Sequence, residues 1–231
     1  MCIFAKIFSK AYHIFTNFDK KETLETKGRI IEGAAQLFFA YGIRNVSMDD
    51  IAKHIGMSKK TIYQYFTDKD DLVHQFMEVG VNEQMCEMRE VAESSENVVE
   101  ELHKAMLKTR DMFHQINPLM LFELKKYHPK AWEIFNQCKD GEMKAHLIDT
   151  LRKGIKEGVF RSDIDVEVLA KMRVEQSQLI FDPKIFPPTQ FNVAEVSVQL
   201  FEHFVYGIIT LKGLNLLNQY KRQTQQANIT T

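Results

Sequence analysis

The side chains with the clearest chemistry lie between positions 58 and 65, in the segment SKKTIYQY. Ammonium and hydroxyl groups can bind phosphates, and a glutamine amide can hydrogen-bond the edge of a base. No acidic residue interrupts the segment. This combination on one short helix is typical of a surface that contacts DNA. The candidate DNA-binding residues, with one flanking residue on each side, are Ser47, Ser58, Lys59, Lys60, Thr61, Tyr63, Gln64, Tyr65 and Lys69.

Two short helices joined by a tight turn are needed to position this segment. Ser47 is a suitable N-cap for the first helix, and two acids follow in its first turn, where the helix dipole favours them. Gly56 can adopt the left-handed conformation that ends a helix, and Ser58 can cap the second one. An ordinary helical hairpin would explain each feature singly. Their combination in this order favours a helix-turn-helix that binds DNA.

Residues 28–73 also resemble a known family. They read GRIIEGAAQLFFAYGIRNVSMDDIAKHIGMSKKTIYQYFTDKDDLV, which contains A-x-x-L-F-x-x-x-G, then I-A-x-x-x-G-x-S-x-x-T-I-Y-x-Y-F, then K-D-D-L. This stretch is similar to the N-terminal domain of the TetR family of transcriptional regulators. The resemblance implies an all-α chain with an N-terminal three-helix DNA-binding domain and a helical domain for effector binding and dimerisation. It also implies that Lys69 contacts phosphate.

Composition restricts how the chain can meet DNA. The formal net charge is -1 and the pI is about 6.7, so a DNA contact must come from a local basic face. Cys2, Cys86 and Cys138 are an odd number without metal or redox spacing, which fits a reduced, cytoplasmic setting. No apolar run is long enough to span a bilayer.

Residues 1–19 form an amphipathic N-terminal arm whose apolar residues recur at helical spacing. A secretory signal is disfavoured because Lys6 and Lys10 interrupt the apolar stretch. The arm could pack on the protein, lie on a membrane surface, or be an upstream extension outside the functional protein. Membrane binding ranks below the other two, because the resemblance begins only after the arm.

The remaining sequence predicts further helices and no strands. We place the DNA-binding domain at residues 20–67, a helical domain at 68–220 and a flexible tail at 221–231. Expected helices span residues 20–41, 68–92, 98–116, 118–127, 129–157, 163–182 and 191–220. A loop at residues 93–97 is expected to act as a hinge, and Gly158 to stop the fifth of these helices.

The C-terminal part lacks the marks of an enzyme. It contains no G-x-S-x-G, no phosphate loop and no H-E-x-x-H, and its histidines are scattered, so we expect no catalysis, metal or cofactor. Its large apolar side chains either fill a core or line a pocket. The resemblance implies a small apolar or amphipathic effector. The candidate ligand-binding residues are Phe113, Phe122, Trp132, Phe135, Met172 and Gln176.

The last predicted helix carries more apolar surface than one core face requires, which suits a two-fold symmetric interface. A monomeric helix buried on all sides is the alternative. The candidate dimer-interface residues are Val196, Leu200, Phe204 and Ile208. The expected function is a ligand-responsive transcriptional repressor that binds a palindromic operator as a homodimer. The alternative is a non-enzymatic helical co-activator, adaptor or ligand-binding protein without its own operator.

Overall fold

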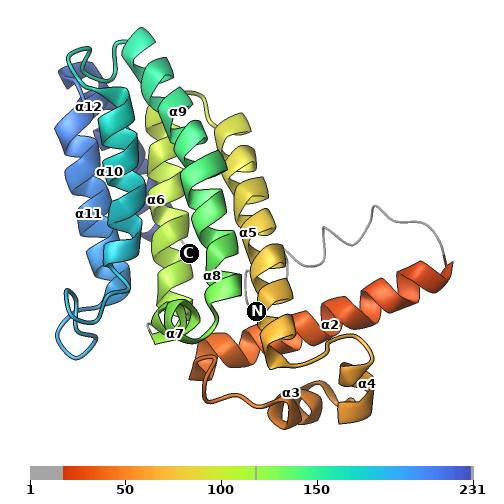
Figure 1. Cartoon of the computed structure of the whole chain (residues 1–231). Helices are drawn as coiled ribbons and strands as arrows, with labels where there is room; N and C mark the ends of the chain where they lie inside the picture. Colours follow the sequence, from red (N-terminus) through yellow and green to blue (C-terminus); the bar gives the residue numbers. More distant parts are fainter. Residues whose placement is uncertain (1–17, 118, 230–231) are drawn as a thin grey trace. The chain divides into compact units, whose positions relative to one another are not determined.

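The computed structural model describes residues 18–117 and 119–229, and nearly all of them lie in helices joined by short loops (Figure 1). Within these ranges no strand forms, and a single isolated bridge pairs Phe160 with Ile209. The prediction of an all-α fold is confirmed. Residues 1–17 of the predicted arm lie outside the described residues.

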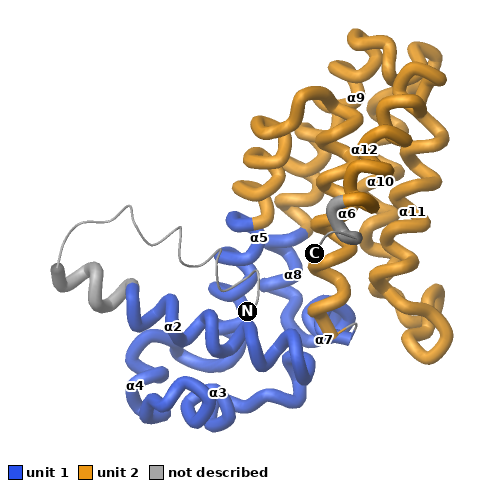
Figure 2. Tube along the Cα trace, turned by 180° about the vertical axis from the view of Figure 1, so that it is seen from behind, with its two compact units in different colours: residues 1–83, 119–135 blue, residues 84–118, 136–231 orange. Residues whose placement is uncertain are grey.

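The chain divides into two compact units (Figure 2). Unit 1 comprises Met1–Glu83 and Leu119–Phe135, and unit 2 comprises Gln84–Pro118 and Asn136–Thr231. Two helices, α5 (Lys69–Glu93) and α8 (Pro129–Cys138), contribute residues to both units. This division differs from the predicted boundary after residue 67. It also assigns α7 (Leu119–Tyr127) to the unit that contains the helix-turn-helix.

Unit 1 is built around a three-helix group of α2 (Phe18–Tyr41), α3 (Met48–Ile55) and α4 (Lys59–Tyr63). Apolar residues at three- and four-residue spacing turn inward from each helix and from the start of α5. The side chains with at most 1% of their surface exposed include Ile30, Phe38, Ile51, Ile62, Phe66 and Leu72. The rings of Phe38 and Phe76 meet edge to face with centroids 5.6 Å apart.

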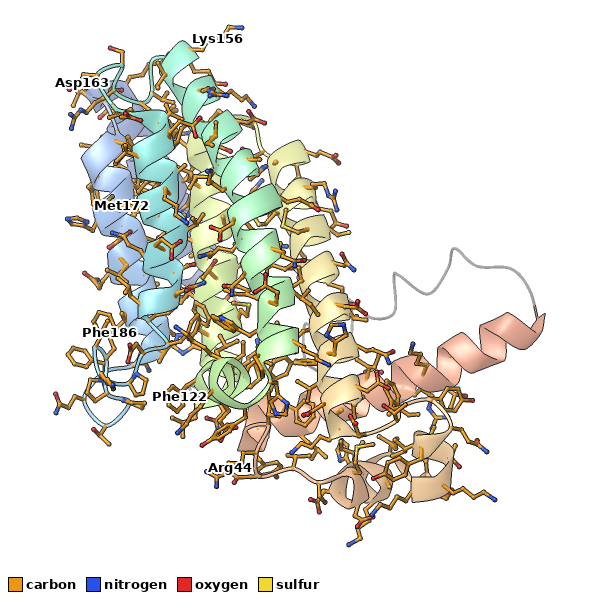
Figure 3. All side chains as sticks on the ribbon, in the orientation of Figure 1. Arg44, Phe122, Lys156, Asp163, Met172 and Phe186 are labelled. Atoms are coloured by element: carbon orange, nitrogen blue, oxygen red, sulfur yellow. The ribbon has the colours of Figure 1, made fainter. Side chains whose placement is uncertain are left out.

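Helix α7 is bonded to the turn between α2 and α3. Gly42 ends α2 with a φ of 80°, which a glycine adopts without strain. Beyond it, the backbone N–H of Arg44 donates to Oε2 of Glu123 at 3.0 Å, and the Arg44 guanidinium lies 5.3 Å from the ring centroid of Tyr127. Arg44 is labelled in Figure 3. The entry to α3 is therefore fixed partly by α7.

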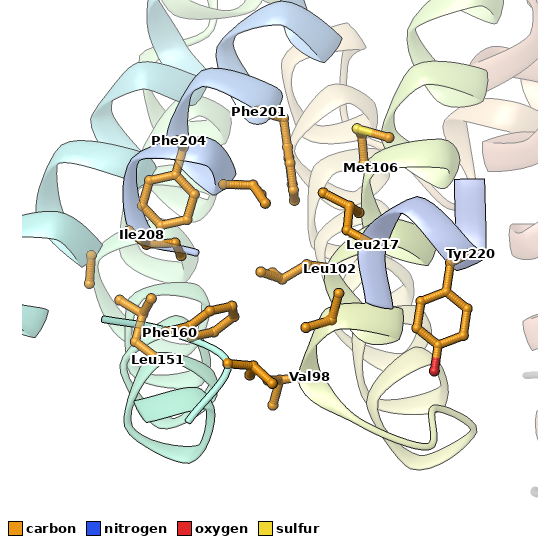
Figure 4. Packing of buried hydrophobic residues seen from close by; sticks show 14 of the residues in the cluster. Val98, Leu102, Met106, Leu151, Phe160, Phe201, Phe204, Ile208, Leu217 and Tyr220 are labelled. Carbon is orange, nitrogen blue, oxygen red and sulfur yellow. The ribbon is translucent and has the colours of Figure 1, made fainter. Parts of the chain in front are cut away.

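Unit 2 contains a helical bundle made of α6 (Val98–Gln115), α9 (Lys144–Lys156), α10 (Val166–Leu179), α11 (Val193–Ile208) and α12 (Leu211–Ile229). Helix α6 packs against α9, α11 and α12. Apolar side chains from these helices meet in one core (Figure 4). The core includes Leu102, Leu151, Phe160, Phe204 and Ile208.

The predicted helix over residues 191–220 is wrong, because α11 and α12 are separate helices. The break at Ile209 and Thr210 comes from hydrogen bonds to a distant turn: Thr210 N donates to Val159 O at 2.9 Å, and Arg161 N donates to Ile208 O at 2.8 Å. A Cβ at Gly213 would lie 2.4 Å from Val159 O, so the close approach of α12 to this turn also requires a glycine at position 213.

Two other predictions need adjustment. Helix α12 continues to Ile229, so the predicted flexible tail is helical up to that residue, and residues 230–231 lie outside the described part. The helix predicted over residues 129–157 forms as α8 and α9, with a π-helical turn at Lys139–Met143 between them. Gly158 follows α9 with a φ of 70°, the left-handed conformation predicted for a helix stop.

Gly33 is expected to be required where α2 meets α3, because a Cβ there would lie 2.1 Å from Cγ2 of Ile55. Gly33→Ala should lower the free energy of unfolding by about 1–3 kcal/mol through overpacking. Gly28→Ala is the matched control in the same helix, since nothing lies within 4 Å of its added Cβ. It should stabilise by up to about 1 kcal/mol. Urea unfolding measures both, and equal stability of the two variants would contradict the close approach.

Candidate nucleic-acid interface

Helix α3 begins with a complete capping box. Ser47 Oγ accepts a hydrogen bond from Asp50 N at 3.2 Å, and Ser47 N donates to Asp50 Oδ2 at 2.8 Å. Hydrogen bonds from the Ser47 side chain and then from its backbone hold the pKa of Asp50 below its ordinary value. The N-terminus of α3 is therefore satisfied by its own residues. The Ser47 hydroxyl, a predicted phosphate ligand, also donates to Asp50 Oδ2 at 2.6 Å.

The turn between α3 and α4 has the predicted geometry. Gly56 has a φ of 68° and a ψ of 31°, which is left-handed, and its N–H points to the carbonyls of Ala52 and Lys53. Met57 N then donates to Ala52 O at 3.0 Å. Because these bonds close the end of α3, the chain reverses direction within a few residues and enters α4.

Helix α4 is short, and its two sides differ sharply. Ser58 caps it by accepting from Thr61 N at 3.0 Å, and Ile62 is fully buried. With Ile62 turned inward, α4 and its C-cap residue face solvent on the other side. The exposed side chains there are Lys59, Lys60, Tyr63 and Gln64, while Thr61 and Tyr65 are half-buried. The predicted DNA-binding residues on this segment therefore share one accessible region.

The two lysines of α4 have different surroundings. Lys59 Nζ lies 3.0 Å from Asp49 of α3, and the hydrogen bond with that carboxylate raises the pKa of Lys59. Lys60 is exposed and makes no ion pair or hydrogen bond with the described residues. The segment SKKTIYQY is acid-free in sequence, but the fold brings an acid from α3 to one of its lysines. Lys60 is thus the cation of α4 that is free to meet a phosphate.

Lys69 has a structural contact that the sequence did not reveal. Its half-buried ammonium donates to the carbonyl of Ile43 at 2.6 Å, in the turn between α2 and α3. Burial lowers the pKa of Lys69, while the nearby carboxylates of Glu123 and Asp70 act in the opposite direction. The start of α5 is therefore fastened to the same turn that α7 contacts.

Sequence reasoning missed the contacts that α7 and His128, the residue just before α8, make with this site. Glu123 accepts from Arg44 N, as described above, and His128 Nδ1 lies 2.7 Å from Asp70 Oδ1. The partners are 79 and 58 residues apart in sequence. No local pattern marks pairs of this separation, so only the folded chain reveals them.

The six predicted ligand-binding residues do not share one unit. Phe122, Trp132 and Phe135 belong to unit 1, and the rings of Trp132 and Phe135 lie 5.0 Å apart. Phe113, Met172 and Gln176 belong to unit 2. Met172, labelled in Figure 3, is 39% exposed on α10, which is unlike a pocket residue. Oε1 of Gln176, in contrast, is buried.

The predicted dimer-interface residues also divide into two groups. Phe204 and Ile208 are 2% and 1% exposed, and they pack inside the core of unit 2. These two side chains therefore offer no surface to a partner, and that part of the prediction is corrected. Val196 and Leu200 are half-buried on α11. The exposed apolar side chains of the neighbouring helix α10 are instead Val168, Met172 and Leu179.

Across residues 18–117 and 119–229, no group of three or more His, Cys, Asp or Glu side chains is arranged to hold a metal ion. None of the helices in this described part combines the length and apolarity that a bilayer span requires.

Residues 30–76 match the family model described as bacterial regulatory proteins, tetR family. This segment of the chain is a DNA-binding domain of the TetR type. It is 27% identical over 163 residues to YvaF, an uncharacterized HTH-type transcriptional regulator of Bacillus subtilis, covering 70% of this chain and 85% of YvaF. It is 23% identical over 146 residues to the transcriptional repressor KstR2 of Mycobacterium tuberculosis, covering 62% of this chain and 73% of KstR2.

The fold of this chain is shared by solved structures of transcriptional regulators. One is the transcriptional regulator FadR from Bacillus subtilis in complex with stearoyl-CoA, with a TM-score of 0.55 and 20% identity. The likeness covers 78% of this chain and 98% of that one. The helix-turn-helix is therefore that of a DNA-binding transcriptional regulator, and the helical domain after it shares the fold of such proteins.

Ser47→Ala should remove the cap of α3 and lower the free energy of unfolding by about 1 kcal/mol, whereas Ser47→Thr keeps a capping hydroxyl and should cost less. The pH dependence has a defined sign. Asp50 has a lowered pKa in the folded state, so its contribution is present above its ordinary value of 3.8 and is lost as the pH falls through the lowered value. Urea unfolding at neutral and at acid pH should show the gap between Ser47→Ala and the wild type narrowing on acidification. A gap that is absent at neutral pH would contradict the capping role.

Proposed function

We propose that this chain is a homodimeric transcriptional repressor, without catalytic activity, that acts in the cytoplasm and releases a palindromic operator when a small apolar or amphipathic effector binds. The observation that carries the proposal is the accessible face of α4, where unpaired Lys60 lies beside exposed Tyr63 and Gln64. Buried Ile62 fixes which way that face points.

The α4 face would enter the major groove of DNA. In this assignment Ser47, Ser58, Thr61, Tyr63, Tyr65 and Lys69 position the protein on phosphates. Lys59, Lys60 and Gln64 are candidates for base edges, and phosphate is the alternative contact for the two lysines. A two-fold symmetric dimer would present the face twice. The half-site centres should then be separated by about one turn of DNA or somewhat more.

The dimer interface would form on α10 and α11. Val168, Met172 and Leu179 recur at helical spacing along α10 and are 60%, 39% and 41% exposed, respectively. Half-buried Val196 and Leu200 of α11 would extend this apolar face. An isologous interface of two helices from each protomer would cover these side chains.

The effector would act through unit 2. KstR2 is a repressor, which supports repression by this chain. FadR was solved with stearoyl-CoA, which supports a ligand-responsive role for a chain of this fold. Because α5 and α8 contribute residues to both units, a shift of either helix can reach Lys69 and His128 in unit 1. Lys69 contacts the α2–α3 turn, and His128 contacts Asp70. These contacts would form a physical route to the DNA-binding helices.

The alternative is a co-activator or adaptor that has no operator of its own. A gel shift on the DNA just upstream of its own gene separates the two functions, because an adaptor would not shift naked DNA. The repressor proposal expects a specific shift that competitor DNA does not remove. Absence of any shift there, or on genomic fragments at large, would contradict it.

Lys60→Ala combined with Tyr63→Phe should weaken operator binding and flatten its dependence on salt. The expected change in the slope of log K against log salt is about one for each protomer, since each loses one cation near phosphate. Lys156→Ala is the matched control, because Lys156 is exposed and lies in unit 2. Fluorescence anisotropy over a salt series measures the slope. An unchanged slope in the double variant would place a different helix on the DNA.

Val168→Glu combined with Met172→Glu should separate the dimer into monomers, because paired carboxylates would face each other across a two-fold axis. Tyr41→Glu is the control, since Tyr41 is as exposed as Val168 at 60% but belongs to unit 1. Sedimentation velocity over a concentration series reports the oligomeric state. A wild type that stays monomeric, or a double variant that stays dimeric, would contradict this interface.

A further inference from the structure

Arg173 on α10 is a cation without a counter-ion. Its guanidinium carbon lies 4.5 Å from the ring centroid of Phe201 and 5.9 Å from that of Phe204, both on α11. Figure 4 shows these two rings in the core of unit 2. Among the described residues, Arg173 forms no ion pair and no hydrogen bond.

The neighbouring charges on α10 make this isolation specific to Arg173. Lys171 lies 2.9 Å from Asp140 and 2.6 Å from Glu175, and buried Lys139 lies 2.8 Å from Glu175. Asp140 and Glu175 therefore pair with these two lysines, and Glu167 of α10 pairs with Arg152. Burial alone lowers the pKa of the Arg173 guanidinium from its ordinary value to about 10, and no carboxylate counteracts it.

Placing an unpaired guanidinium against aromatic rings costs desolvation free energy. Cation–π contact offsets part of the free energy that the guanidinium loses on dehydration. Its N–H donors still need hydrogen-bond acceptors. Buried charges in proteins are normally paired, and removing a charge that lacks a partner often stabilises the fold. Arg173 thus resembles one half of an ion pair whose other half is not part of the chain.

A second unpartnered polar group lies one helical turn away. Oε1 of Gln176 is buried and has no hydrogen-bond partner. Residues three apart lie on neighbouring positions of a helix surface, so Gln176 and Arg173 occupy adjacent positions on α10. A glutamine amide has both donors and an acceptor, so it can bind either an anionic oxygen or a hydroxyl beside it.

We propose that Arg173 and Gln176 bind the anionic group of the effector, and that the effector is an organic acid with an apolar body, either a carboxylate or a phosphate ester. This inference rests on the proposed ligand-responsive function and gives the ligand its chemical class. The planar fork of Arg173 suits the paired oxygens of either anion. Phe201 and Phe204 supply the apolar side of the site.

The test uses the full-length protein without DNA and four probes with the same ten-carbon chain: decanoate, decyl phosphate, decanol and decyltrimethylammonium. Thermal unfolding and calorimetric titration measure binding to the wild type, Arg173→Met and Arg173→Lys. Arg152→Met is the matched control, because Arg152 is an exposed arginine of unit 2 that pairs with Glu167. Decanoate and decyl phosphate separate the two sources of the anion.

The wild type should bind at least one of the two anions at least tenfold more tightly than decanol, and the ammonium probe least. Arg173→Met should lose this preference, Arg173→Lys should retain part of it, and Arg152→Met should keep it. In the absence of any probe, Arg173→Met should melt at a higher temperature than the wild type, because it removes a half-buried charge that has no ion-pair partner.

Equal binding of decanoate, decyl phosphate and decanol would overturn the proposal, and so would no binding of either anion or full anion binding by Arg173→Met. A lower melting temperature for Arg173→Met than for the wild type, both without probe, would show that Arg173 stabilises the fold instead. Operator release is measured separately. Anion binding that depends on Arg173 but leaves the operator bound would contradict ligand-responsive repression and leave the anion site standing.

Discussion

The burial of Ile62 is the contact on which the DNA-facing part of the structure depends. Helix α4 has five residues, and a helix of that length is not stable alone in water. Ile62 is fully buried, and neighbouring Phe66 is 1% exposed, so packing holds this turn in helical form. The same packing fixes the rotation of α4. Lys60, Tyr63 and Gln64 face solvent because Ile62 occupies the core.

Contacts around the start of α3 also fix the position of the DNA-facing helices. Gly33 lets α2 approach Ile55 closely, and the capping box of Ser47 and Asp50 sets where α3 begins. Lys69 of α5 and Glu123 of α7 both bond to the turn before α3, at Ile43 and Arg44. The position of the DNA-facing helices therefore depends on helices that the family resemblance alone would assign to the effector domain.

Local signals were sufficient for the helix-turn-helix. Ser47, Gly56 and Ser58 act through their own neighbours in sequence, so their caps and turn could be predicted and are confirmed. The break after Ile208 could not be predicted, because hydrogen bonds to Val159 and Arg161 cause it and neither Ile209 nor Thr210 is a helix breaker. An apolar stripe likewise does not distinguish a core from an interface.

The sequence also did not reveal which charged residues pair with each other in the fold. The segment around Lys59 contains no acid, yet Asp49 reaches it from the preceding helix. On α10 the reverse holds, because Glu175 lies two residues from Arg173 in sequence but pairs with Lys171 and Lys139 in the fold. In both cases tertiary packing decides which charge remains free, and both free charges, Lys60 and Arg173, are among the residues to which we assign binding roles.

Site-specific crosslinking tests the central claim most directly. A photo-crosslinking phenylalanine at position 63 should react with operator DNA at two symmetric positions, one in each half-site. The same group at Tyr206, which is 49% exposed in unit 2, should not react with DNA. Crosslinks from position 206 with none from position 63 would show that another surface binds DNA and would contradict the account.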